Sequence, residues 1–155
     1  MTTVTGSGVV DMKLLAVKMR TADPRLKKAL RKKLTDAARP VARRVQDSIL
    51  SMPAHDEAGL RAETAATVKV TSRISRSGIS VSIVSYGGKM PAGKESLPKH
   101  LDSSRGWGHP VWGHRDRWVR QRGKPQWFET PPTLNRNEFR SACEAAMNET
   151  ARQLT

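Results

Sequence analysis

Residues 23–51 decide the fold, and they read DPRLKKALRKKLTDAARPVARRVQDSILS. Asp23 followed by Pro24 is typical of a helix start, because the carboxylate accepts hydrogen bonds from free backbone amides and proline suits the first helical position. Apolar residues then recur every three or four positions and predict one amphipathic helix that reaches about Ser51. The predicted apolar stripe comprises Leu26, Leu30, Leu34, Ala37, Val41, Val45 and Ile49.

Two further features of this helix follow from its sequence. Pro40 lies in the interior, where proline removes one backbone hydrogen bond and crowds the preceding turn, so we expect a kink there. The polar face is strongly basic, because nine cations occur among residues 25–44. Six of them are the candidate residues for contact with DNA or with an acidic protein surface: Arg25, Lys28, Arg31, Lys32, Arg39 and Arg43.

The segments next to the basic helix are less regular. Residues 1–9 mix Thr, Gly, Ser and Val without a helical period, and we expect a flexible arm or a short edge strand. Crowded apolar residues between Val10 and Arg20 favour a short helix. Met52-Pro53 ends the long helix, and residues 60–66 fit either a further helical turn or the beginning of a strand.

A β-hairpin is expected in the middle of the chain. Thr67–Ile74 and Ile79–Tyr86 alternate between apolar and polar residues, and Arg76-Ser77-Gly78 supplies turn residues between them. Gly87-Gly88 ends the second strand. Residues 87–106, rich in Lys, Pro, Gly and Ser, are expected to form a long flexible loop.

Residues 106–128 contain all four tryptophans and one of the two phenylalanines. The glycines and Pro110 in this segment favour a β-arm or ribbon over a helix. Such clustered aromatic residues either close the subunit's own core or form a surface for another chain, and both readings stay open. The candidate subunit-interface residues are Trp107, His109, Pro110, Trp112, Trp118, Trp127 and Phe128.

The C-terminal segment predicts a second amphipathic helix. It begins at Leu134 or Phe139, after Pro131-Pro132, and its apolar stripe includes Phe139, Cys143, Ala146 and Met147. We therefore expect an α+β fold in a single domain over residues 1–155. A small antiparallel sheet is packed by the long kinked N-terminal helix and by the C-terminal helix.

Charge is the most unusual bulk property of the chain. Among 155 residues, 28 Lys and Arg face 14 Asp and Glu, which gives a formal net charge of +14. Such a balance favours a polyanionic partner or a solvated basic face. The single cysteine, Cys143, excludes an internal disulfide, and we expect it to be a buried packing residue. No apolar run is long enough to span a bilayer and no signal-peptide core is present, so we expect no membrane partner and synthesis in a reducing cytoplasm.

Catalytic and metal chemistry are disfavoured. His100, His109 and His114 lie near Asp102 and Asp116, but the surroundings are cationic and no second ligand cluster occurs. His109 before Pro110 is expected to be a hydrogen-bonded structural histidine. Neither a Gly-x-Ser-x-Gly nucleophile motif nor a glycine-rich phosphate loop is present. We therefore expect no enzymatic activity and no cofactor.

The order of these segments resembles one family of phage proteins. A kinked basic helix, a β-hairpin, a Gly/Pro loop, a Trp-rich segment and a C-terminal amphipathic helix are similar to the gene-ten-type tail components of siphophages, which are neck or tail-completion proteins. Met12–Met52 matches in pattern, while Ala58-Gly59-Leu60-Arg61 departs from the family's Thr-Gly-x-Leu turn. The specific match is carried by His109-Pro110-Val111-Trp112-Gly113, Trp118, Gln121 and Trp127-Phe128.

The resemblance implies a structural subunit of the head–tail connector that serves in tail completion or as a terminator. Such a subunit assembles into a homo-oligomeric ring, with a hexamer expected, around the DNA channel of the virion. Its partners would be neighbouring neck and tail-tube proteins, with non-specific contact to DNA in the channel. From the residues alone, a second hypothesis is a free-standing, sequence-independent DNA-binding protein, because cations and tryptophans are interleaved as in phosphate-binding surfaces.

Overall fold

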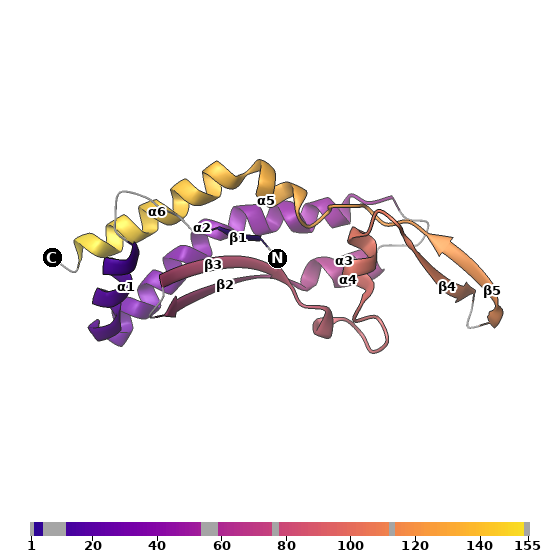
Figure 1. Cartoon of the computed structure of the whole chain (residues 1–155), viewed down its shortest axis with the longest axis horizontal. Coiled ribbons are helices and arrows are strands. Elements are labelled where there is room, and N and C mark those ends of the chain that lie inside the picture. The colour runs from indigo at the N-terminus through magenta and orange to yellow at the C-terminus, as the bar shows by residue number, and fades with distance from the viewer. Residues whose placement is uncertain (1, 5–11, 54–58, 76–77, 112–113, 154–155) are drawn as a thin grey trace.

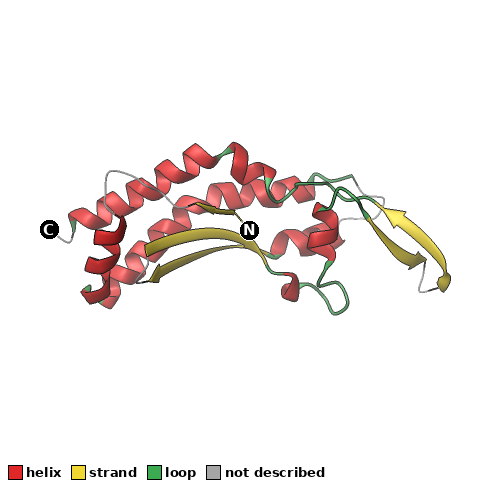
Figure 2. Ribbon diagram, viewed as in Figure 1, coloured by secondary structure: helices red, strands yellow, loops and turns green. Residues whose placement is uncertain are grey.

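The computed structural model describes residues 2–4, 12–53, 59–75, 78–111 and 114–153 (Figure 1). It confirms the α+β class, with helices and antiparallel strands in one chain (Figure 2). The helices are α1 (Met12–Thr21), α2 (Pro24–Leu50), α3 (Gly59–Ala66), α4 (Leu97–Asp102), α5 (Thr130–Leu134) and α6 (Arg136–Arg152), with a single 3-10 turn at Gly87–Lys89. The strands are β1 (Thr2–Val4), β2 (Val68–Ser75), β3 (Gly78–Ser85), β4 (Trp107–Val111) and β5 (His114–Gln121).

Helix α2 is the central element of the body. Asp23 caps its first turn as predicted, because the Asp23 Oδ1 accepts a hydrogen bond from the Arg25 amide at 2.6 Å. The helix spans 27 residues and continues through Pro40 to Leu50, which corresponds to a length of about 40 Å. The kink expected at Pro40 stays a prediction.

The body has three layers, with α2 between the sheet and α6 (Figure 1). The buried face of α2 includes the predicted residues Leu30, Leu34, Val41, Val45 and Ile49. It is wider than predicted, because it also includes alanines. The additional fully or nearly buried residues are Ala38 and Ala42, while the predicted Leu26 and Ala37 lie at the edge of the core.

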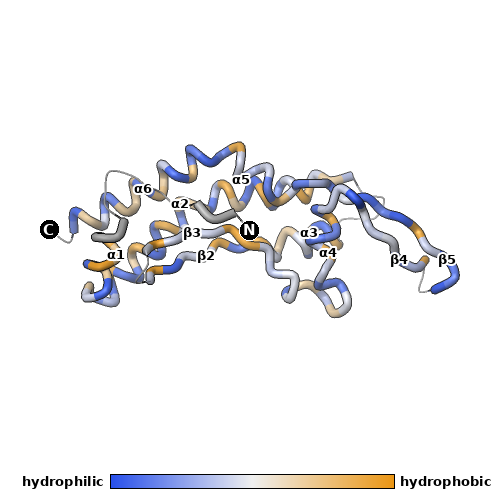
Figure 3. The backbone as a smooth tube through the Cα atoms, in the orientation of Figure 1, coloured by the Kyte–Doolittle hydropathy of each residue, from blue (hydrophilic) through white to orange (hydrophobic). Residues whose placement is uncertain are grey.

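The sheet confirms the predicted hairpin. Strands β2 and β3 pair antiparallel in a register that places Val70 opposite Ile83 and Ile74 opposite Ile79. Residues of one face, including Val81, pack against α2 in the core. Figure 3 shows the hydrophobic positions concentrated along α2 and the sheet, as this packing requires.

Two predictions concern the N-terminal region, the arm at residues 1–9 and the short helix before residue 20. Residues 2–4 form an edge strand against β3, in the order β1-β3-β2, so this part of the expected arm at residues 1–9 is a strand. The remainder of the arm lies outside the described residues. The short helix predicted before residue 20 is confirmed as α1, which buries Leu15, Ala16 and Met19 against the rest of the core.

Helix α6 confirms the C-terminal prediction. Phe139, Cys143, Ala146 and Met147 are buried against α2. Ion pairs cross the two helices, and the shorter ones join Lys33 Nζ to Glu149 at 2.7 Å and Arg44 Nη1 to Glu138 at 2.6 Å. These pairs lie at the surface and contribute about 0–1 kcal/mol each, so apolar burial holds α6 in place.

The prediction of a flexible loop over residues 87–106 is wrong in part. The segment contains the 3-10 turn at Gly87–Lys89 and helix α4, in which Pro98 and Leu101 are buried. Helix α4 has only six residues, which is too short for a helical period to appear in the sequence. Its order comes from distant partners, since Trp127 and Phe128 bond to it across nearly thirty residues.

The molecule is elongated, and strands β4 and β5 extend from the end opposite the C-terminus (Figure 1). The accessible surface is 10288 Å² for a mass of 17.2 kDa, whereas a compact monomer of this mass exposes about 7,800 Å². The chain therefore exposes about 2,500 Å² more than a compact monomer. A standard protein interface covers about 800 Å² per partner, so the excess matches more than one such surface.

Candidate functional site

The Trp ribbon, which we define as strands β4 and β5, is the most exposed part of the fold. The predicted β-ribbon is confirmed, with an antiparallel register that pairs His109 with Val119 and Pro110 with Trp118. The register shifts between Pro110 and Val111, so the strands are irregular toward the tip. Every residue of β5 is exposed, and the ribbon points away from the helical body (Figure 2).

Trp118 is the principal exposed aromatic residue of the ribbon, with 64% of its surface accessible. Its indole covers Gly108, since a Cβ added at Gly108 would lie 3.5 Å from Trp118 Cε3. The Trp118 Nε1 donates to the Arg115 carbonyl at 2.8 Å. The ring is thus held in one orientation by the ribbon itself while its outer face is left open.

The base of the ribbon is fixed to α4. The Trp107 ring stacks on His100, with centroids 6.0 Å apart. Arg120 donates to the Arg105 carbonyl at 2.8 Å across the base. Gly106 has a positive φ of 67°, and a Cβ there would meet the Gln121 carbonyl oxygen, so the chain turns into β4 at a position where only glycine fits.

The remaining candidate residues of this segment differ in their positions. His109 and Pro110 are half-buried on the ribbon, and His109 Nδ1 lies 3.0 Å from the Pro110 carbonyl oxygen, which confirms a structural, hydrogen-bonded histidine. Trp112 lies outside the described residues. Strand β5 itself is basic, because Arg115, Arg117 and Arg120 are exposed beside a single carboxylate, Asp116.

Trp127 and Phe128 are buried in the protomer's own core, and their place at a subunit interface stays a prediction. Trp127 is 1% exposed and its Nε1 donates to the Pro98 carbonyl at 3.2 Å. Phe128 is 8% exposed, and its ring packs edge-on against Trp127 with centroids 5.5 Å apart. Most of the surface of both side chains is therefore covered within the protomer. The clustered tryptophans therefore have two different environments. Trp127 is buried in the core, whereas Trp118 is exposed on the ribbon.

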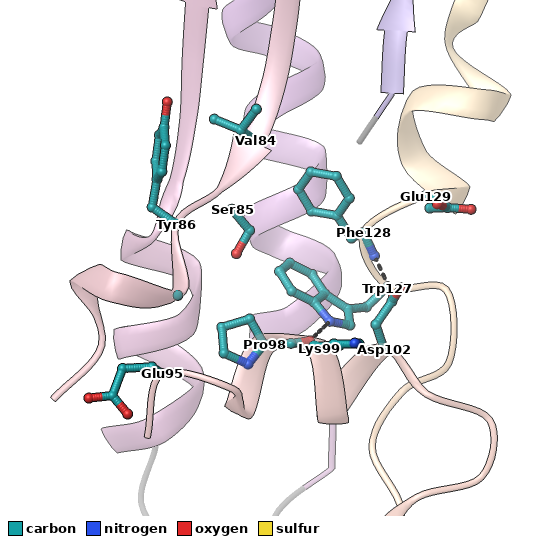
Figure 4. Close-up of a pocket in the computed structure, with 11 residues that line it drawn as sticks. Val84, Ser85, Tyr86, Glu95, Pro98, Lys99, Asp102, Trp127, Phe128 and Glu129 are labelled. Carbon is teal, nitrogen blue, oxygen red and sulfur yellow. Dashed lines mark hydrogen bonds between the residues drawn. The ribbon is translucent and has the colours of Figure 1, made fainter. Parts of the chain in front are cut away.

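A pocket lies where Trp127 and Phe128 meet α4 and the end of β3 (Figure 4). Its volume is 410 Å³, which is within the usual range of binding pockets. Apolar side chains form its floor, and charged groups surround its mouth. The apolar and aromatic lining residues are Val84, Tyr86, Pro98, Trp127 and Phe128, and the charged ones are Glu95, Asp102, Glu129 and Lys99.

We call this cavity the acidic pocket, because three carboxylates and one ammonium group line it in a chain that is otherwise strongly basic. Asp102 is held in place by the Phe128 amide, which donates to its Oδ1 at 3.2 Å. Hydrogen bonds from the backbone amides of Glu95 itself and of Gly93 keep the pKa of the Glu95 carboxyl below its usual value. Both groups are therefore oriented by the backbone near the mouth of the pocket.

The basic face of α2 is divided between internal contacts and a free stripe. Lys33 and Arg44 bond to α6, so they serve the protomer. Helical spacing places five other cations on one stripe, together with Asp36. Asp36 bonds to Lys32 at 2.8 Å and to Arg39 at 3.2 Å, and these cations lower its pKa. The basic stripe comprises Arg25, Lys28, Lys32, Arg39 and Arg43, all exposed.

Arg31 lies apart from that stripe. It faces a notch of 350 Å³ at the junction of α1, α2 and β2, together with Arg20 and Lys27. The Lys27 Nζ donates to the Arg20 carbonyl at 2.9 Å, which holds it at the notch. Of the six cations predicted to face DNA or an acidic surface, five share the stripe and Arg31 lies in the notch.

No group of three or more His, Cys, Asp or Glu side chains with metal-binding geometry occurs within the described ranges. Cys143 is buried as predicted, and desolvation, followed by the nearby Glu144 charge, raises the pKa of its thiol to about 11. Among the described helices, none is both long enough and apolar enough to cross a membrane.

Comparison of the chain with protein-family models, with curated proteins and with solved structures gives no match. Sequence reasoning missed the acidic pocket, because Glu95, Asp102 and Glu129 are spread over 35 positions and no local pattern connects them. Composition gave no signal either, because residues 89–129 hold only four carboxylates against nine Lys and Arg.

Proposed function

We propose that the protein is a non-enzymatic structural subunit of a tailed-phage neck ring, acting as a head–tail connector, tail-completion or terminator protein of the virion. The observation that carries the proposal is the Trp ribbon, a basic β-hairpin that projects from the body and exposes 64% of Trp118. The resemblance of the Trp-rich segment to siphophage neck proteins supports the same conclusion.

An isolated two-stranded hairpin is marginally stable in water. Apart from the contacts at its base with α4, the described ribbon is held mainly by its own cross-strand pairing. Large exposed aromatic residues on such an element are typical of contacts that another chain completes.

A ring is favoured over a two-fold dimer because the ribbon lies at one end of an elongated molecule. A ribbon that contacts a different surface of the next copy makes a head-to-tail interface, and repetition of such an interface closes into a ring when the rotation permits. Six subunits is the expected number from the resemblance. DNA would pass through the central channel, and neighbouring neck and tail-tube proteins would contact the two faces of the ring.

The test of this proposal is the solution mass of the purified protein by light scattering, with negative-stain images of the same sample. We expect a closed ring of several subunits with a central hole. A protein that stays monomeric over the micromolar to millimolar range, or that forms only two-fold dimers, contradicts the proposal.

The basic stripe favours a second function, that of a free-standing DNA-binding protein. The side chains of Arg25, Lys28 and Arg43 are exposed and form no ion pair with a carboxylate in the described part of the chain. Binding through such cations releases counterions, so affinity for any duplex should fall steeply with salt and show little sequence preference. Each phosphate contact contributes about 0.9 to the slope of log affinity against log salt.

Anisotropy titrations with labelled duplexes test this alternative. We expect Arg25→Ala and Lys28→Ala each to reduce the salt slope by about one. Arg44→Ala is the matched control, because Arg44 bonds to α6 instead of facing solvent on the stripe. A slope unchanged in the stripe variants, or a strong sequence preference, contradicts the alternative.

A further inference from the structure

We propose that the acidic pocket is the receptor for the Trp ribbon of a second copy of this chain, so that Trp118 of one protomer docks between α4 and β3 of the next. The proposal rests on the proposed function, because it specifies the contact through which the ring would assemble. The ribbon and the pocket match in polarity and in charge, and both are held rigidly.

The floor of the acidic pocket and the Trp118 indole match in polarity. The floor of the pocket is aromatic and apolar, with Trp127, Phe128 and Pro98 buried beneath an opening that also exposes Tyr86. Such a floor binds a flat apolar group. Trp118 presents one, since its ring is largely exposed and its Nε1 is already satisfied by the Arg115 carbonyl. Burying the indole therefore leaves no donor without an acceptor.

The pocket and the ribbon also carry opposite charges. Glu95, Asp102 and Glu129 surround the pocket beside a single cation. The ribbon presents Arg115 and Arg117 next to Trp118, with Asp116 as its only carboxylate. A cationic aromatic hairpin and an acidic aromatic pocket are complementary, and a match of this kind fixes orientation and raises the association rate.

Both surfaces are held rigidly before they meet. The Trp118 ring is fixed against Gly108, and the Asp102 carboxylate is fixed by the Phe128 amide. Pre-ordered partners lose little conformational freedom on binding. Strand β5 spans eight residues, which gives a reach of about 25 Å, long enough to cross into a neighbouring protomer.

The ribbon and the pocket are different surfaces, so the contact is head-to-tail and two defective variants should complement each other. Trp118→Ala removes the docking group and keeps the pocket. Glu129→Arg reverses a charge at the pocket mouth and keeps the ribbon; Glu129 is exposed, so the fold is retained. Each variant alone should associate about 30-fold more weakly than wild type, the effect of losing one interface hot spot.

Light scattering of the two variants, alone and mixed in equal amounts, tests the proposal. We expect monomers for each variant alone and heterodimers for the mixture, because only one ribbon–pocket contact can form between the two. Leu134→Ala and Asp47→Arg are matched controls, an exposed apolar truncation on α5 and an exposed charge reversal on α2, and both should assemble as wild type does. Circular dichroism checks that all four variants are folded.

The outcomes separate this inference from the proposed function. If wild type assembles and both site variants assemble equally well, the docking contact is wrong and the ring proposal stands. If the mixture gives heterodimers but wild type forms open chains in negative-stain images, the docking contact is supported and the closed ring is contradicted. If wild type is monomeric at every concentration, docking between copies is overturned.

Discussion

Replacing Trp127 by alanine should lower the free energy of unfolding by about 3–5 kcal/mol, the effect of removing a fully buried aromatic side chain. Trp127 is 1% exposed and forms the floor between α4 and β3. Its loss also leaves the Pro98 carbonyl without the indole donor at 3.2 Å and removes an edge-on contact with Phe128. A typical domain has only about 5–15 kcal/mol in total, so this change is large.

Trp127→Phe separates the two contributions. Phenylalanine keeps most of the apolar contact but donates no hydrogen bond to Pro98, so the expected loss is about 1–3 kcal/mol, the effect of an unsatisfied buried acceptor. Trp118→Ala is the matched control, because it removes the same residue type from an exposed position. It should change the stability of the monomer by no more than about 0.5 kcal/mol.

Urea unfolding followed by far-ultraviolet circular dichroism measures all three variants. The protein concentration must be low enough for wild type to be monomeric, because association adds concentration-dependent stability. The slope of the free energy of unfolding against urea concentration should be the same in each variant as in wild type. A loss below about 1 kcal/mol for Trp127→Ala, or an equal loss for Trp118→Ala, would refute the assignment of Trp127 to the core and Trp118 to the surface.

Three further predictions concern the rest of the chain. The thiol of Cys143 has its pKa raised from 9.0 to about 11 by burial, so the unfolded chain loses this proton first as the pH rises; wild type should therefore lose stability relative to Cys143→Ala between pH 9 and pH 11, measured as the difference between their urea curves at each pH. Gly123→Ala would place a Cβ 2.5 Å from the Leu101 Cα and against its carbonyl, so we expect a loss of about 1–3 kcal/mol and faster amide exchange in α4. The Arg44–Glu138 pair is at the surface, and a double-mutant cycle in alanine should give a coupling below about 1 kcal/mol; a larger value would mean that the pair, and not apolar burial, holds α6.

Much of the fold could be predicted from the sequence because its elements have strong local patterns. The Asp23-Pro24 start and the apolar repeat from Leu30 to Ile49 specify α2, since capping and burial on one helix face act over neighbouring turns. The alternation around Val70 and Ile83 similarly specifies the hairpin. The glycines and Pro110 of the Trp-rich segment favour a ribbon over a helix, and strands β4 and β5 confirm that prediction.

The parts that could not be predicted depend on contacts between distant residues. Helix α4 has no period of its own and is ordered by Trp127 and Phe128, which lie 26 to 29 positions away. The buried face of α2 also includes Ala38 and Ala42, which the predicted stripe did not contain. Which cations are free also depends on tertiary pairing, since Lys33 and Arg44 differ from Arg43 only in facing α6.

The candidate site divides in the same way. The basic charge of the chain, the clustering of its aromatic residues and the cationic face of one helix can be read from the sequence, because they are properties of composition and spacing. The burial of Trp127, the exposure of Trp118 and the convergence of three distant carboxylates on one pocket follow from the three-dimensional packing. The physical reason is that burial and convergence depend on which elements pack against each other, and one-dimensional spacing carries no information on a partner 30 residues away.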